Sequence, residues 1–178
     1  MSAIREIRGE AIADAFSQLC DLISDNHKAT DQLFLASIAD GGVPVGKKLV
    51  AALSSKLGRE IHCGVLNISF ERDDLGRNPI PKDTVATTIP MSVDGATVIL
   101  IDDVLFSGRT VRAALNELFS QGRPARVELA VLADRGHRRL PVHADYVGMT
   151  IETTVSEDVK VNIDLENSAN DRIEVFIK

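Results

Sequence analysis

Two adjacent acidic residues, Asp102 and Asp103, follow the apolar run Val98–Ile101 and precede the turn Leu105–Gly108. Carboxylates accept hydrogen bonds from hydroxyl groups and bind hard cations such as Mg²⁺. The glycine-containing turn offers backbone N–H groups, which bind phosphate together with the positive end of a following helix. The hydroxyls of the turn's serine and of Thr110 add donors. These residue types in this order suit a ligand that carries a phosphate and a diol or a metal, and a sugar phosphate fits that description.

The residues around the two acids predict a strand, a turn and a helix. An uninterrupted apolar run is typical of a parallel strand covered on both faces. From Arg109 or Thr110 onward, apolar residues recur at helical spacing: Val111, Ala114, Leu115 and Leu118. Ligands of open α/β sheets bind beyond the carboxyl ends of the strands, so this junction predicts a binding site. The alternative is an ordinary strand–turn–helix with Ser107 as N-cap and solvated acids.

A second junction of the same kind lies earlier in the chain. Leu33–Ala39 predicts a buried strand, Asp40-Gly41-Gly42 a turn, and Val43–Leu57 a helix with Pro44 in its first turn, where proline is tolerated. Two such junctions along one parallel sheet converge on one ligand, so this loop is expected to contact a pyrophosphate group beside the acids. Simple turn geometry is the alternative reading of the two glycines.

The remaining pattern predicts one α/β domain over residues 1–178, with a mainly parallel central sheet flanked by helices. The long polar stretch Glu71–Pro90 predicts a flexible loop that closes as a lid. The other expected elements are a helix over Ile7–Asn26 and strands over Ile61–Phe70, Ala125–Ala133, Tyr146–Val147, Val159–Leu165 and Ile173–Ile177.

Composition indicates a globular protein of the cytoplasm. Hydrophobic residues make up 44% and charged residues 26% of the chain. No window approaches the roughly 20 apolar residues of a membrane span, and the N-terminal residues lack the apolar core of a secretory signal. Cys20 and Cys63 lack metal-ligand spacing, so buried thiols are expected. The net charge of −6 argues against non-specific coating of nucleic acid, although a local basic face remains compatible with it.

The segment Val98–Leu118 resembles the signature of the type I phosphoribosyltransferases, which bind phosphoribosyl pyrophosphate (PRPP). The resemblance implies that Asp102 and Asp103 lie at the ribose hydroxyls and that the following loop holds the 5′-phosphate. The residues implied for PRPP are Asp40, Gly41, Gly42, Asp73, Asp102, Asp103, Val104, Leu105, Phe106, Ser107, Gly108, Arg109 and Thr110.

Three longer pieces, Ser69–Gly76, Val98–Phe119 and Gly122–Gly148, resemble the pyrimidine operon attenuation protein/uracil phosphoribosyltransferase family, PyrR. This resemblance implies a phosphoribosyltransferase fold with a small base-binding hood and a flexible loop. It also implies the reaction uracil + PRPP → UMP + diphosphate. The implied cofactor is Mg²⁺, held by PRPP together with Asp102 and Asp103 rather than by the protein alone.

The same resemblance implies roles for individual residues. Asp102, Asp103 and Arg72 are the implied catalytic residues, and Asp103 is also a candidate base toward the uracil N–H. Arg72 and Asp73 would close over PRPP. The segment Asp134–Arg135 would lie beside the base, mostly through backbone groups.

A second implied role is binding of the pyrimidine-operon mRNA leader, strengthened by UMP, in a homo-oligomer. A local basic cluster supplies phosphate contacts despite an acidic total charge. The candidate RNA contacts are Arg112, Arg123, Arg126, His137, Arg138 and Arg139. A solvated or subunit-interface position is the alternative for Arg138 and Arg139, and a structural role is the alternative for His137.

Two positions depart from the family pattern. Many members carry an arginine-bearing loop where this chain has Asp40-Gly41-Gly42, and His143 stands where an arginine is usual. Loss of a cation near the pyrophosphate would weaken catalysis. One alternative is therefore a catalytically weak or inactive, nucleotide-sensing RNA-binding regulator. A second alternative is a phosphoribosyltransferase for a purine base.

Overall fold

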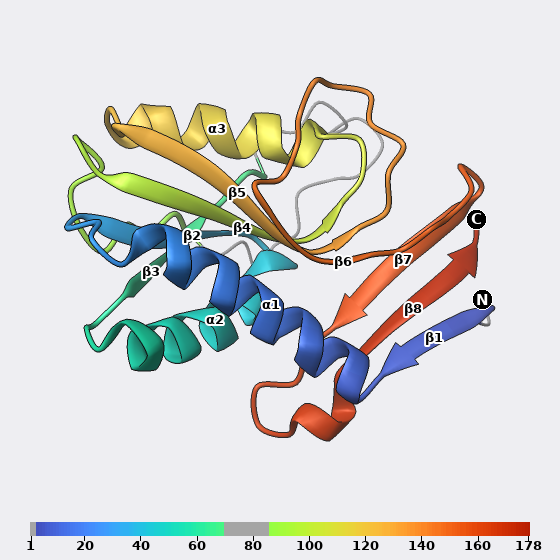
Figure 1. Cartoon of the computed structure of the whole chain (residues 1–178). Helices are drawn as coiled ribbons and strands as arrows, with labels where there is room; N and C mark the ends of the chain where they lie inside the picture. Colours follow the sequence, from blue (N-terminus) through green and yellow to red (C-terminus); the bar gives the residue numbers. More distant parts are fainter. Residues whose placement is uncertain (1–2, 70–85) are drawn as a thin grey trace.

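A five-stranded parallel sheet forms the centre of the molecule in the computed structural model, which describes residues 3–69 and 86–178 (Figure 1). Its spatial order is β3-β2-β4-β5-β6, and every neighbouring pair is parallel. The strands are β2 (Leu33–Ile38), β3 (His62–Leu66), β4 (Thr97–Leu105), β5 (Arg126–Asp134) and β6 (Tyr146–Thr150). The expected parallel α/β sheet is confirmed.

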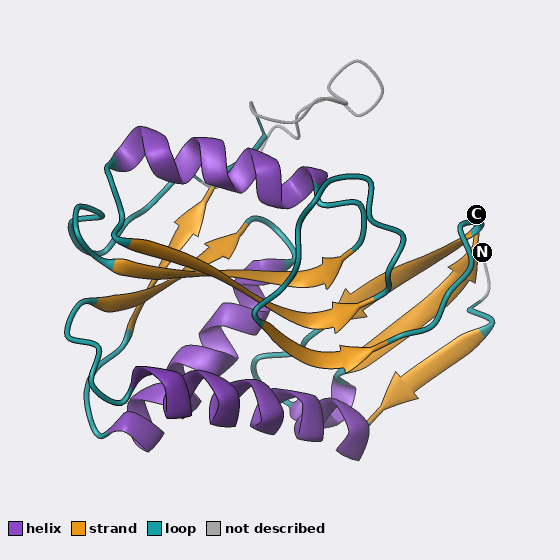
Figure 2. Ribbon diagram, turned by 45° about the horizontal axis from the view of Figure 1, so that its top comes forward, coloured by secondary structure: helices purple, strands orange, loops and turns teal. Residues whose placement is uncertain are grey.

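Helices cover both faces of this sheet (Figures 1 and 2). Helices α1 (Glu10–His27) and α2 (Gly42–Leu57) lie on one face, and α3 (Arg109–Gln121) lies on the other. Successive side chains of β4 point to opposite faces. Ile99 and Ile101 join the core under α1 and α2, while Val98 and Leu100 join the core under α3. The uninterrupted apolar run of β4 follows from this double burial.

A smaller antiparallel sheet, here called the hood, stands beside the central sheet. Its order is β1-β8-β7, from β1 (Arg5–Arg8), β8 (Arg172–Ile177) and β7 (Glu157–Asn162). Ile173 and Val175 of β8 are fully buried and pack against the α1 and α2 core. The first and last strands of the chain therefore lie side by side (Figure 1).

The predicted N-terminal helix was wrong over its first residues. Ile7 belongs to β1, where it pairs with Ile173, and the helix begins only at Glu10. Gly9 separates the two elements with φ of +61°, a left-handed conformation that glycine adopts without steric cost. The apolar Ile7 suits either element, and its distant partner in β8 decides between them.

Several strand boundaries also differ from the sequence prediction. β4 continues through the two acids to Leu105, β3 is shorter than the predicted Ile61–Phe70, and β7 begins and ends earlier than the predicted Val159–Leu165. Most of the predicted loop Glu71–Pro90 lies outside the described residues. Where the description resumes, Thr88 forms a bridge to Val65 of β3.

A buried polar network ties α1 to β5 and β6. Glu128 is 3% exposed, and one of its carboxylate oxygens lies 2.7 Å from His27 Nε2 and accepts a hydrogen bond from the Tyr146 hydroxyl at 2.8 Å. Its other oxygen lies 2.6 Å from Nε of Arg126, whose side chain is 67% exposed.

We expect Glu128→Ala to lower the free energy of unfolding by about 3 kcal/mol, because His27 and Tyr146 lose a buried partner. Arg126→Ala should cost less than about 1 kcal/mol, since that ion pair faces solvent on one side. Urea unfolding of both variants measures the difference. Equal losses would contradict the assigned burial.

Candidate active site

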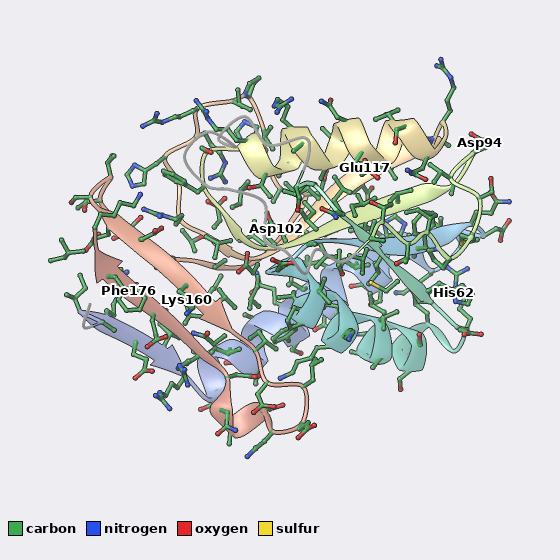
Figure 3. All side chains as sticks on the ribbon, turned by 180° about the vertical axis from the view of Figure 1, so that it is seen from behind. His62, Asp94, Asp102, Glu117, Lys160 and Phe176 are labelled. Atoms are coloured by element: carbon green, nitrogen blue, oxygen red, sulfur yellow. The ribbon has the colours of Figure 1, made fainter. Side chains whose placement is uncertain are left out.

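Asp102 and Asp103 lie in the carboxyl-terminal half of β4, between β2 and β5. Figure 3 shows Asp102 near the middle of the molecule, between the helical layers. Burial, reinforced by the charge of Asp103, raises the pKa of Asp102 well above its ordinary value. Burial also raises the pKa of Asp103. The hydrogen bond that the Val104 N–H donates to its carboxylate at 2.8 Å lowers the pKa by a smaller amount. The pair thus forms a costly concentration of negative charge, which a cation or sugar hydroxyls would stabilise.

The loop between β2 and α2 packs directly on this pair. A Cβ at Gly41 would lie 2.5 Å from Cγ of Asp103, and a Cβ at Gly42 would lie 2.2 Å from the carbonyl oxygen of Ile101. The loop therefore packs so closely on β4 that a side chain at either position would collide with the strand. This packing, and not only the geometry of the turn, favours glycine at both positions. The structure brings the two predicted junctions together. An arginine at position 41 would require the Asp103 side chain to shift.

Helix α2 begins at Gly42, and no side chain caps its N-terminus. The first N–H groups of a helix have no acceptor within the helix and attract anions. The Val43 N–H donates to the carbonyl of Asp40 at 3.2 Å, which closes the turn, and the Asp40 side chain is exposed. This end of α2 has the chemistry expected of a pyrophosphate-binding loop.

The predicted phosphate loop connects β4 to α3 through Phe106–Gly108. Gly108 has φ of +88° and is the N-cap of α3, so the alternative with Ser107 as N-cap is wrong. Within the described residues, the N–H groups of Phe106, Ser107 and Gly108 donate to no protein acceptor. Three adjacent donors before a helix N-terminus form a cradle suited to a phosphate group.

Arg135 follows β5 and joins the phosphate loop to the hood. Its side chain is 1% exposed, and Nη1 lies 2.8 Å from a carboxylate oxygen of Asp158 in β7. Nη2 donates to the carbonyl of Glu157, and the guanidinium lies 4.4 Å from the ring centre of Phe106. The side chain of Arg135 is thus used for internal contacts, which leaves backbone groups for the base contact predicted at Asp134–Arg135.

We expect Arg135→Ala to lower the free energy of unfolding by about 2 kcal/mol, through lost packing on Phe106 and an unsatisfied carbonyl at Glu157. Asp158→Ala should cost under about 1 kcal/mol, because the Asp158 side chain is 58% exposed. Thermal unfolding of the two variants tests this difference. A larger loss in Asp158→Ala would contradict it.

The predicted RNA contacts do not form one cluster. Arg123 and Arg126 lie at the amino end of β5, whereas His137–Arg139 follows its carboxyl end. Arg139 is exposed and Arg112 is half-buried on α3. His137 Nε2 lies 2.6 Å from the carbonyl of Thr153, a structural contact. Arg72 and Asp73, predicted to close over PRPP, lie outside the described residues.

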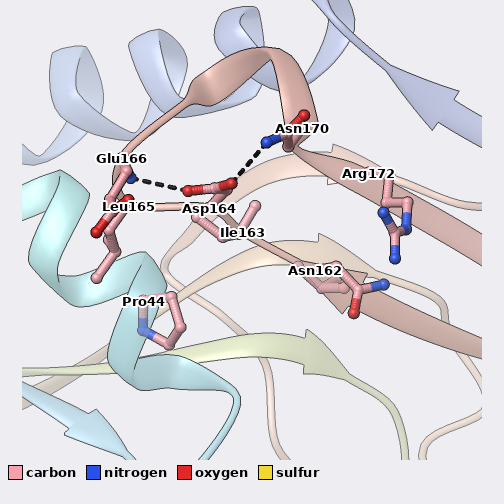
Figure 4. A pocket seen from close by; sticks show the side chains of 9 residues that line it. Pro44, Asn162, Ile163, Asp164, Leu165, Glu166, Asn170 and Arg172 are labelled. Carbon is pink, nitrogen blue, oxygen red and sulfur yellow. Dashed lines mark hydrogen bonds between the residues drawn. The ribbon is translucent and has the colours of Figure 1, made fainter.

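A cavity of about 690 Å³ lies beside the first turn of α2, between Pro44 and the hood (Figure 4). Asn162, Asp164 and Arg172 line it. The carboxylate of Asp164 accepts hydrogen bonds from the side-chain amide of Asn170 and from the backbone N–H groups of Asn167 and Glu166, and these bonds lower the pKa of Asp164. No sequence motif predicted this segment, because its chemistry depends on how the hood is placed.

The chain is similar to known phosphoribosyltransferases. A family model described as Phosphoribosyl transferase domain matches residues 6–166. A protein named Bifunctional protein PyrR from Geobacter sp. (strain M21) is 39% identical over 93% of both chains. A protein of the same name from Chloroflexus aurantiacus is 42% identical over 88% of this chain and 86% of the relative. The solved hypoxanthine phosphoribosyltransferase of Trypanosoma cruzi has a TM-score of 0.69 at 20% identity, covering 100% of this chain and 98% of that one.

The parallel fold and the matching family model define a type I phosphoribosyltransferase. Within that class the chain belongs to the PyrR family. Among the described residues, no helix combines the length and apolar character needed to cross a membrane.

Proposed function

We propose that this chain is a cytoplasmic uracil phosphoribosyltransferase, which converts uracil and PRPP to UMP and diphosphate. The observation that carries the proposal is the contact of Gly41 and Gly42 with β4 at Asp103 and Ile101. It gathers a helix N-terminus, paired carboxylates and a phosphate loop at one edge of the sheet. The PyrR relatives support uracil as the base, while the hypoxanthine enzyme supports the fold alone.

The protein groups act by position and charge rather than by a covalent nucleophile. The ribosyl C1 becomes oxocarbenium-like as diphosphate leaves, so fixed negative charge beside the ribose lowers the barrier. Asp102 and Asp103 hold the ribose hydroxyls, Phe106–Gly108 holds the 5′-phosphate, and the start of α2 holds the diphosphate. Asp103 is the proposed base that accepts the uracil proton, and burial raises its pKa above the ordinary value.

The site residues fit Mg²⁺ shared with the substrate. Among the described residues, no group of three or more His, Cys, Asp or Glu side chains gathers into a metal site. Two buried carboxylates are the donors that Mg²⁺ prefers when substrate phosphates complete its coordination. Bound with PRPP, the ion would neutralise charge on the leaving diphosphate, and Asp102 and Asp103 would hold it.

The test is UMP formation from PRPP, Mg²⁺ and labelled uracil, with hypoxanthine and guanine run in parallel. UMP from uracil alone would support the proposal. Products from a purine base alone would support the purine alternative. No product, with UMP still bound in calorimetry, would support the catalytically inactive regulator.

The second proposed function is regulation of pyrimidine-operon mRNA by a homo-oligomer of this chain. UMP would raise the affinity of this homo-oligomer for the RNA leader. The naming of the relatives as bifunctional supports it. Arg139 is one of the predicted contacts that are exposed and able to reach an RNA phosphate. Gel shifts of leader RNA with and without UMP, using wild type and Arg139→Ala, test it. RNA binding unaffected by UMP would contradict the proposed regulation.

A further inference from the structure

The guanidinium of Arg138 lies against the phosphate loop. Nη1 is 3.2 Å from the carbonyl oxygen of Leu105 and 2.9 Å from that of Phe106. Nε donates to the carbonyl of Val142 at 3.1 Å, and Nη2 pairs with the carboxylate of Asp134. The side chain is 19% exposed. Every nitrogen of this guanidinium is therefore occupied by protein acceptors.

The backbone after Arg138 completes the same arrangement. The N–H groups of Arg139 and Leu140 both donate to the carbonyl of Ser107, at 3.0 and 3.1 Å. The N–H of Arg135 donates to the carbonyl of Leu105 at 3.1 Å. All three consecutive carbonyls of residues 105–107 thus accept hydrogen bonds from the segment after β5.

The direction of these carbonyls fixes the direction of the next N–H groups. The C=O and N–H of a planar trans peptide point to opposite sides. The carbonyls of Leu105, Phe106 and Ser107 belong to the peptides that carry the N–H groups of residues 106–108. Since those carbonyls turn toward Arg138 and its neighbours, the N–H groups turn away from them. These are the donors that find no acceptor among the described residues.

We infer that Arg138 is a positioning residue for the 5′-phosphate of the substrate. It holds the carbonyls at Leu105 and Phe106 so that the N–H groups of Phe106 and Ser107 are oriented toward the phosphate before it binds. Such preorganisation removes an ordering cost from binding. The inference rests on the proposed function and assigns Arg138 to the substrate site instead of to RNA.

Isothermal titration with two probes, ribose 5-phosphate and magnesium pyrophosphate, tests this role. Arg138→Ala is expected to weaken ribose 5-phosphate binding about tenfold or more and to leave pyrophosphate binding within about twofold, because pyrophosphate is assigned to the start of α2. Arg138→Lys should rescue little, since one ammonium cannot replace a fork that bonds several acceptors. Arg8→Ala is the matched control, an exposed arginine on β1 expected to bind both probes like wild type.

Each alternative outcome has a definite meaning. Unchanged ribose 5-phosphate binding in Arg138→Ala would overturn the inference. Equal weakening of both probes would also overturn it, since that pattern reports general loss of structure. If Arg138→Ala lost binding of leader RNA but kept ribose 5-phosphate binding, Arg138 would be an RNA contact, as the sequence predicted. A wild-type chain that binds neither probe would instead overturn the proposed function and, with it, the inference.

Discussion

Asp103→Asn is expected to slow UMP formation at least about a hundredfold while raising the thermal unfolding midpoint at neutral pH. The amide keeps the acceptor for the Val104 N–H but removes the charge beside the ribose and the proposed proton acceptor. The same change relieves repulsion with buried Asp102, whose pKa is raised by burial and by the Asp103 charge. We therefore expect this one substitution to lower the rate of UMP formation and to raise the stability of the fold.

The pH dependence of stability has a definite sign. A carboxyl whose pKa is higher in the folded than in the unfolded state binds more protons when folded, so the folded state loses stability as pH rises from the ordinary value toward the raised one. Asp102 and Asp103 both shift upward from an ordinary pKa of 3.8. The stability gain of Asp103→Asn should accordingly be largest near neutral pH and shrink as pH falls toward 4.

Calorimetric unfolding of wild type and variant between pH 4 and 8 measures this gain, alongside UMP formation by each. Asp14→Asn is the matched control, because Asp14 is an exposed aspartate on α1 and loses the same charge. Each kcal/mol corresponds to roughly 2–4 °C for a chain of this size. An Asp103→Asn protein that melts below wild type at neutral pH would refute the burial argument.

Local patterns in the sequence predicted the central sheet well, for a physical reason. β4 is covered on both faces, so its apolar run is continuous and readable. The hood is harder to read, because its strands are half exposed and pair with segments far away in the chain. Ile7 is the clearest case, since its strand exists only through pairing with Ile173, more than 160 residues later.

The types of residue at the candidate site were predictable, and their contacts were not. The two acids and the glycine-containing turn predict a ligand that carries a phosphate and a sugar. The approach of Gly41 to Asp103 depends on the register of β2 against β4, in which Ser37 pairs with Ile101. The family resemblance predicted Arg138 as an RNA contact, whereas its guanidinium contacts backbone carbonyls that no motif encodes.

Gly42→Ala is the second substitution with a large expected effect. A Cβ there would lie 2.2 Å from the carbonyl oxygen of Ile101 and 3.3 Å from Cα of Asp102. Both atoms belong to the backbone of a central strand, so the start of α2 must move instead. We expect UMP formation to fall at least about a hundredfold, since misplacement near 1 Å has that cost. The free energy of unfolding should fall by about 2 kcal/mol.

The readouts are steady-state kinetics with PRPP and uracil, and urea unfolding. Ala51→Ser, an exposed change on the same helix, controls for substitution in α2 and should stay within about 0.5 kcal/mol of wild type. The affinity for magnesium pyrophosphate reports directly on the position of the loop between β2 and α2. We expect this affinity to fall, because displaced N–H groups no longer converge on the anion. If Gly42→Ala kept both its pyrophosphate affinity and its rate, the close packing of this loop on β4 would not position the diphosphate, and the paired acids would have to act without it.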